Sequence, residues 1–315
     1  MSNCATLFLC PEFYLYSMEY VQLGKADLRI SRISFGCMSL GDDAAANETI
    51  LHRALDLGIN FFDTADLYAK GMNEAFVGKA LKPYRDKIYL ASKVGNQWRA
   101  DGSGWDWNPR KEYILAQIEG SLKRLQTDYL DLYQLHGGTI DDPIDETIEA
   151  FELLKQQGKI RHYGISSIRP NVIREYIKRS NIISVMMQYS LLDRRPEETC
   201  LSLLQQNNIG VLVRGAVAQG LLVNKPLKAY LNYSPREVEK AAAAVQSIST
   251  NERNAAQTAL LFVLQHPAIT SVVAGIRTVQ QLEEAVGVLG SRKLTPQEME
   301  LLQQAVVANK YEQHR

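Results

Sequence analysis

The chain has 315 residues, and its 35 Lys and Arg residues balance its 35 Asp and Glu residues, so the formal net charge is zero. This balance predicts neither a basic face for nucleic acid nor an acidic tail, and no apolar run approaches the ~20 residues that span a bilayer. A hydrophobic content of 46% is that of an ordinary globular core. We therefore expect a globular protein that binds neither nucleic acid nor a membrane.

The four cysteines form no C-x-x-C pair and have no His-rich partner: Cys4, Cys10, Cys37 and Cys200. This spacing favours neither a zinc site nor a disulfide framework. We expect no metal site and a cytoplasmic location.

The first residues lack the positively charged segment and the small-residue cleavage site of a signal peptide. Met18 precedes a more regular pattern of alternating apolar and polar residues. We therefore expect residues 1–17 to lie outside the fold and residues 18–315 to form one domain.

Short β-rich runs alternate with amphipathic helical segments from Arg29 onward. Strands are expected at residues 31–36, 60–65, 87–93, 129–136, 161–167, 182–188, 209–215 and 269–276. Two helices, at 233–245 and 254–266, fall in the last crossover but one, and a closing helix is expected at 295–310. No strand carries a G-x-G-x-x-G motif into a helix, which argues against a dinucleotide-binding open sheet. The pattern predicts an α/β fold, a single (β/α)8 TIM barrel with parallel strands and extra helices near the C-terminus.

The stretch N-F-F-D-T-A-D-L-Y, residues 60–68, changes abruptly from a buried strand to polar residues. Asp63 ends the strand, and Tyr68 follows in a short loop. Ligands of α/β folds bind at the carboxyl ends of the strands, so both groups are candidates for a site. Read alone, Asp63 is more simply a solvated turn residue.

Other polar residues end the following strands: Lys93, His136, Ser166, Ser167, Gln188 and Arg214. A barrel brings all of these to one mouth. Each alone has a plainer interpretation, as a solvated strand end or a buried structural histidine. Complementary titratable groups on three consecutive strands, with a tyrosine between them, favour a catalytic site.

The residue types suggest a chemistry. A tyrosine, with an ordinary pKa near 10, becomes a useful acid when a neighbouring lysine stabilises its phenolate. Asp63 would keep Lys93 charged, and His136 would hydrogen-bond a substrate carbonyl. Together they would protonate a carbonyl oxygen, but none can supply a hydride, so reduction requires a nicotinamide cofactor.

From about Met18 to its C-terminus the sequence resembles the aldo-keto reductase superfamily, and within it bacterial NADPH-dependent enzymes and the branch that includes potassium-channel β-subunits. The residues that carry the resemblance are FFDTADLY, LASKVG, DLYQLHG, GISS, Gln188 in MQYSLLDR, AQGLL (218–222) and VAGIRTVQQLEEAV (273–286). It implies a catalytic tetrad of Asp63, Tyr68, Lys93 and His136, with Tyr68 as general acid. It also implies that aldehyde and ketone carbonyls are reduced to alcohols with NADP(H).

The resemblance further implies where the cofactor binds. Ser166, Ser167 and Gln188 would hold the nicotinamide carboxamide, while Gly36, Met38 and Asp63 would line the cofactor, Gln219, Gly220 and Leu221 would wrap the pyrophosphate, and Gly275, Arg277, Gln281 and Glu284 would hold the adenosine. Arg277 would bind the 2′-phosphate that distinguishes NADPH. Arg214 would also bind the cofactor, at the position where many relatives have an aromatic residue that stacks on the nicotinamide, since a guanidinium can stack on a planar ring. Ser167 stands where Asn is common.

The segment 96–109 contains all three Trp residues and follows Lys93. It fits either a mobile lid with aromatic walls for substrate or a packed surface loop.

Two other functions remain open at this point. A strand-end lysine such as Lys93 can form a Schiff base, as in aldolases. A regulatory protein resembling the channel β-subunits would bind cofactor without needing turnover. For the enzyme, the expected partner is a small-molecule carbonyl substrate.

Overall fold

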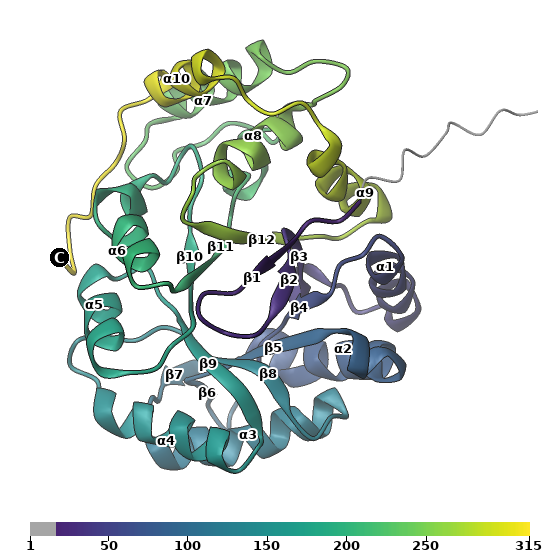
Figure 1. Ribbon diagram of the computed structural model, residues 1–315, viewed down its shortest axis with the longest axis vertical. Helices are drawn as coiled ribbons and strands as arrows, with labels where there is room; N and C mark the ends of the chain where they lie inside the picture. The colour runs from purple at the N-terminus through teal and green to yellow at the C-terminus, as the bar shows by residue number, and fades with distance from the viewer. Residues whose placement is uncertain (1–16) are drawn as a thin grey trace, which may run out of the picture.

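The computed structural model describes residues 17–315, so the extension expected at residues 1–17 lies outside the described residues except for Ser17. Eight parallel strands close into a barrel in the order β10-β11-β12-β3-β4-β5-β8-β9 (Figure 1). They are β3 (Ile33–Gly36), β4 (Phe61–Asp63), β5 (Tyr89–Val94), β8 (Leu130–Leu135), β9 (Ile160–Ser166), β10 (Ser184–Gln188), β11 (Gly210–Arg214) and β12 (Ile269–Gly275). The predicted (β/α)8 TIM barrel is confirmed, and every strand falls at its expected place.

Helices surround the barrel as a ring (Figure 1). They are α1 (Ala44–Asp56), α2 (Met72–Leu81), α3 (Lys111–Leu125), α4 (Ile144–Gln156), α5 (Pro170–Arg179), α6 (Cys200–Gln206), α7 (Pro235–Ser247), α8 (Ala255–Leu264), α9 (Val279–Gly287) and α10 (Pro296–Ala305). In the sequence, both α7 and α8 come between β11 and β12. In space, α10 packs against α7. These are the extra helices expected near the C-terminus.

Local sequence signals start these late helices. Ser234, Asn254 and Thr295 cap α7, α8 and α10, and each forms a reciprocal capping box with the Glu or Gln three residues later. Such a box satisfies two backbone N–H groups that the first turn leaves without an intrahelical partner.

A hairpin of β1 (Tyr20–Gln22) and β2 (Arg29–Ser31) precedes the barrel. Its apolar residues Leu23, Leu28 and Ile30 are buried with Phe61 and Leu132 of the barrel strands in a core distinct from the sheet–helix core. Because these residues sit at the strands' amino ends, they form a plug in that end of the barrel (residues 23–30).

The strand register places the carboxyl ends at one level. Gly36 pairs with Asp63, Asp63 with Ala91, Lys93 with Gln134 and Gln188 with Arg214. The predicted convergence of polar strand ends on one mouth therefore follows from the register.

Residues 96–109 are not an irregular loop. They form an antiparallel hairpin of β6 (Asn96–Trp98) and β7 (Trp105–Trp107), with Trp98 opposite Trp105. Elsewhere, none of the helices within residues 17–315 is long and apolar enough to cross a membrane.

Candidate active site

Lys93 lies near the carboxyl end of β5, and all the N–H bonds of its ammonium group are engaged. Nζ donates to Asp63 Oδ2 at 2.6 Å, to the Thr64 carbonyl oxygen at 2.8 Å and to the Tyr68 hydroxyl at 3.1 Å. Lys93 is 1% exposed and Asp63 3% exposed. An ammonium has three N–H bonds, so all three of its donors point at fixed oxygen atoms.

The carboxylate of Asp63 has a second partner that the sequence interpretation missed. Gln134 Nε2 donates to Asp63 Oδ1 at 3.1 Å, and Gln134 is fully buried. Gln134 lies two residues before His136, so the strand's alternation puts both on the same face. That alternation is the signal by which Gln134 was recognisable.

Lys93 and His136 have displaced proton affinities. Burial alone would lower the pKa of Lys93, but Asp63 and Tyr68 outweigh it and raise that pKa to about 12. Burial, together with the charges of Lys93 and Arg214, lowers the pKa of His136 to about 3. At neutral pH the site therefore contains a charged lysine and a neutral imidazole.

The imidazole of His136 lies beside the phenol. The rings of Tyr68 and His136 meet edge to face, 5.8 Å between centroids and 83° between planes. His136 Nδ1 has no hydrogen-bond partner among the described residues. The structure thus brings all four residues of the expected tetrad together.

Backbone strain follows Tyr68 directly. In the 3-10 turn η2 (Tyr68–Gly71), Ala69 has φ 47° and Lys70 φ 53°, both in the left-handed region. Ala218 (φ 47°) and Gln219 (φ 59°) repeat this in η5 (Ala218–Gly220), after β11. Non-glycine residues adopt such angles rarely, and they cluster at functional sites.

The β6–β7 hairpin packs beside the Tyr68 turn. Lys70 Nζ lies 5.1 Å from the centroid of the Trp98 ring, and Trp107 Nε1 donates to Asp142 Oδ1 at 3.0 Å. A Cβ at Gly95 would lie 2.6 Å from the Trp107 ring, so the ring occupies space that only glycine leaves free. For Trp98 and Trp107 these contacts favour the packed alternative over a mobile lid.

The residues expected to hold a carboxamide lie at the ends of two adjacent strands, and Arg214 ends the next strand. Ser166 ends β9, buried Ser167 follows it, and Gln188 and Arg214 pair in register at the ends of β10 and β11. Arg214 Nη1 donates to Gln188 Oε1 at 2.9 Å. The guanidinium is thus hydrogen-bonded to the amide expected to contact the cofactor.

The remaining predicted cofactor positions also lie at the carboxyl ends. Gly36 and Gly275 pair across β3 and β12, and Met38, in the 3-10 turn η1 (Cys37–Ser39), is 65% exposed. Gly220 follows Gln219 in η5, but the Leu221 side chain is buried in the core.

At the expected adenosine end, two side chains already have protein partners. Gln281 Oε1 accepts from the backbone N–H of Arg277 at 3.0 Å, and Glu284 Oε1 accepts from Asn254 Nδ2 at 2.6 Å. The exposed Arg277 precedes Thr278, which caps α9. Gln281 therefore fixes the Arg277 backbone, a role that the sequence did not reveal.

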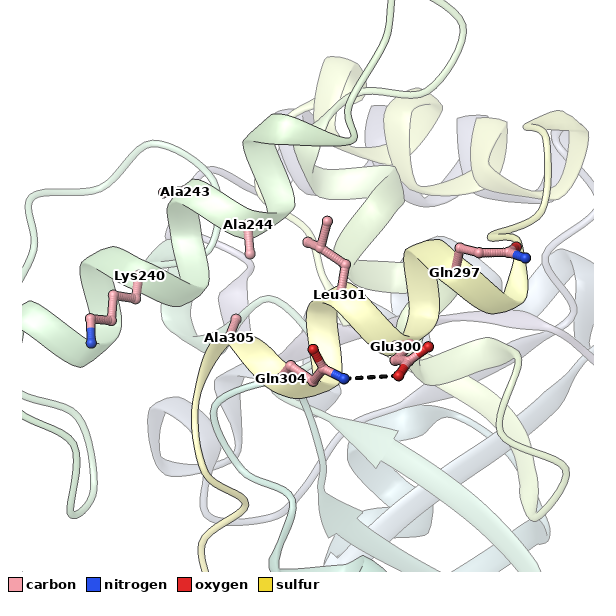
Figure 2. Close-up of a pocket in the computed structure, with 8 residues that line it drawn as sticks. All are labelled: Lys240, Ala243, Ala244, Gln297, Glu300, Leu301, Gln304 and Ala305. Atoms are coloured by element: carbon pink, nitrogen blue, oxygen red, sulfur yellow. Dashed lines mark hydrogen bonds between the residues drawn. The ribbon is translucent and has the colours of Figure 1, made fainter.

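A surface groove lies elsewhere, between α7 and α10 (Figure 2). Ala244, Leu301 and Ala305 line it together with Lys240 and Glu300, and Gln304 Nε2 donates to Glu300 Oε1 at 2.8 Å. It contains none of the converging groups of the barrel mouth. Across residues 17–315, no cluster of three His, Cys, Asp or Glu side chains is arranged to hold a metal ion.

A parallel barrel with converging titratable groups at its carboxyl ends is the arrangement of an enzyme. The Aldo/keto reductase family model matches residues 32–307, and the chain belongs to this family. It is therefore an oxidoreductase of carbonyl compounds that uses a nicotinamide cofactor.

Known proteins resemble it over nearly its whole length. The uncharacterized oxidoreductase YqkF of Bacillus subtilis is 49% identical over 307 residues, which cover 95% of this chain and 100% of the relative. The solved structure of aldo-keto reductase AKR11C1 from Bacillus halodurans, in its holo form, has 52% identity and a TM-score of 0.89, covering 95% of this chain and 100% of that one. The NADH-specific methylglyoxal reductase of Escherichia coli is 30% identical over 308 residues, covering 86% of this chain and 94% of the relative.

Proposed function

We propose that this protein reduces small aldehydes and ketones to alcohols with NADPH, and that Tyr68 is the general acid. The observation that carries the proposal is the contact of 3.1 Å between Lys93 Nζ and the Tyr68 hydroxyl. A cation at that distance stabilises the phenolate that remains after the proton has moved to the carbonyl oxygen.

The other groups have roles that follow from their contacts. Asp63 and Thr64 hold the ammonium in place, so the phenol faces a fixed positive charge. His136, neutral through its low pKa, offers a hydrogen bond to the carbonyl oxygen without competing as an acid. When bound, the cofactor supplies the hydride that no side chain can.

The chemistry of the mouth supports a nicotinamide dinucleotide. Ser166 and Gln188 are polar groups suited to a carboxamide, and the turn at Gln219 and Gly220 follows β11, the strand that pairs with the strand of Gln188. Arg277, just before the first turn of α9, has a planar fork suited to a phosphate.

The choice of NADPH over NADH rests on Arg277. A relative named as NADH-specific shows that the fold alone does not determine this preference. Arg277→Ala removes a charged hydrogen-bond donor, an interaction of about 1.5–3 kcal/mol, so NADPH should bind roughly tenfold more weakly or worse while NADH affinity changes little. Titrating both cofactors against both proteins checks this, and equal losses would mean that Arg277 only supports its loop.

The catalytic proposal is tested with Tyr68→Phe, which removes one oxygen and keeps the ring. Loss of general acid catalysis should lower kcat for a simple aldehyde about 10²–10⁴-fold. Cofactor affinity, measured by titration, should remain unchanged because the phenol serves the substrate. A variant that reduces the aldehyde at the wild-type rate would exclude Tyr68 as the acid.

The Schiff-base alternative is less well supported. A Schiff base needs a neutral lysine with a free lone pair, whereas Lys93 is charged and engaged by three oxygen atoms. A purely regulatory role would leave the wild-type protein without steady-state turnover of aldehydes.

We place the protein in the cytoplasm, since the described cysteines, Cys37 and Cys200, are buried free thiols.

A further inference from the structure

The side-chain amide of Gln188 has a defined hydrogen-bonding pattern. Nε2 donates to Asp193 Oδ2 and to the Tyr230 hydroxyl, both at 2.9 Å. Oε1 accepts from Arg214 Nη1 at 2.9 Å. Three residues from different segments therefore contact one amide.

These partners allow only one orientation of the amide. A carboxylate is an acceptor only and a guanidinium is a donor only. Turning the amide over would place its oxygen against the carboxylate of Asp193 and its nitrogen against Arg214. Two acceptors would then face each other at Asp193, and two donors at Arg214. In the observed orientation both N–H bonds are used, while the oxygen keeps one lone pair.

Asp193 is itself rigidly held. It is fully buried, and Arg195 pairs with it through Nε to Oδ1 and Nη2 to Oδ2, both at 2.7 Å. The backbone N–H groups and carbonyls of Ser190 and Asp193 bond reciprocally in a tight turn. Arg195 in turn lies 5.4 Å from the centroid of the Tyr311 ring, in the C-terminal segment.

We propose that Asp193 and Tyr230 are positioning residues that together fix Gln188 so that it offers a ligand only a hydrogen-bond acceptor. The site would then select the N–H2 group of a nicotinamide carboxamide over a group without such hydrogens. The inference rests on the proposed function, because it requires the nicotinamide to lie at the mouth beside Gln188.

The test compares two dinucleotides that differ in this one group. NADP⁺ carries the carboxamide, and its 3-acetylpyridine analogue carries an acetyl group without N–H bonds. A hydrogen bond contributes on the order of a two- to tenfold difference in affinity. Wild-type protein should therefore bind NADP⁺ more tightly than the analogue by about that factor in calorimetric titrations.

Asp193→Asn should weaken this preference. The substitution removes the negative charge and one of the two acceptor atoms, so Gln188 is held less firmly in its orientation, although Arg214 still donates to its oxygen. The affinity for 2′,5′-ADP, which lacks the nicotinamide, should stay at its wild-type value. A merely structural role would weaken all three ligands and leave the ratio of the dinucleotides unchanged.

Glu197→Gln is the matched control. Glu197 lies in the same segment and accepts from Arg194 and Tyr189 without contacting Gln188, so its variant should retain the wild-type ratio. Tyr230→Phe provides a second route, because it removes the other acceptor of Gln188 Nε2 and keeps the ring. It should reduce the preference, and it decides the matter if Asp193→Asn does not fold.

The outcomes separate the two proposals. A folded Asp193→Asn protein that keeps the wild-type preference overturns this inference and leaves the reductase proposal intact, and so does a full preference in Tyr230→Phe if Asp193→Asn does not fold. Wild-type protein that turns aldehydes over but shows no preference also overturns only this inference. Wild-type protein that binds neither dinucleotide overturns both.

Discussion

Asp66, two residues before Tyr68, is a buried carboxyl group with an unusual environment. It is 6% exposed, and neither oxygen has a hydrogen-bond partner among the described residues. Burial, and then the charge of Glu74, raise its pKa to about 7. The titratable groups that act with it come from α2, α3, β5 and β8: Glu74, Arg124, Tyr113, Lys93 and Tyr133.

We expect Asp66 to make stability fall as pH rises. Its pKa is higher in the folded chain than the ordinary 3.8, so the folded protein binds its proton more tightly and loses that advantage between about pH 4 and 7. At about 1.4 kcal/mol for each pKa unit, the loss reaches the order of 4 kcal/mol. Asp66→Asn cannot ionise, so denaturant unfolding should show the variant gaining on wild type across this range.

Asp86→Asn is the control, since Asp86 is exposed at the opposite end of the barrel. Its stability difference from wild type should be small and nearly constant with pH. If Asp66→Asn also differs from wild type by a constant amount from pH 4 to 8, Asp66 does not titrate as described.

His136 acts in the opposite sense. Its pKa lies below the ordinary 6.5, because burial, Lys93 and Arg214 disfavour the imidazolium. The unfolded chain therefore takes up a proton that the folded chain refuses, and stability is lost as pH falls from about 6.5 toward 3. Asp66 therefore lowers the stability of the fold as pH rises, and His136 lowers it as pH falls.

At the scale of elements, the barrel strands followed from sequence because each is a short, β-rich apolar run that alternates with amphipathic helical segments. The two hairpins did not. Pairing of β6 with β7 depends on Trp107 packing over Gly95 and on Lys70 meeting Trp98, contacts that only the folded barrel creates. Pairing of β1 with β2 likewise depends on the apolar interior that it covers.

The site divides in the same way. The four residues of the expected tetrad sit at or near the ends of strands β4, β5 and β8, so strand order was enough to collect them. Gln134 lies near the end of β8 as well, but it was missed because only the last polar residue of each strand was considered. Asp193 and Tyr230 lie in loops that reach Gln188 from 5 and 42 residues away. Loop paths of this kind depend on tertiary packing, which no local pattern specifies.

For the whole molecule, the two ends of the barrel divide stability and chemistry. Polar and charged side chains fill the carboxyl end, whereas the plug formed by residues 23–30 fills the amino end with apolar groups. Leu23 is fully buried and Leu28 is 3% exposed. Substitutions in the plug should therefore lower the stability of the fold more than they change the chemistry at the carboxyl end of the barrel.

The last prediction concerns where the fold begins. Met18 packs against the sheet–helix core, and the Tyr20 hydroxyl donates to the Gly58 carbonyl oxygen at 2.8 Å. A chain that starts at Met18 keeps these contacts and the whole plug, so we expect its melting temperature and aldehyde reductase activity to equal those of the full chain. Leu28→Ala, by contrast, should lose about 2–5 kcal/mol in denaturant unfolding because it leaves a cavity in the barrel. Leu227→Ala, at a leucine that is 44% exposed, controls for the substitution itself and should change stability little. A large fall in melting temperature on removal of residues 1–17 would show that those residues belong to the fold.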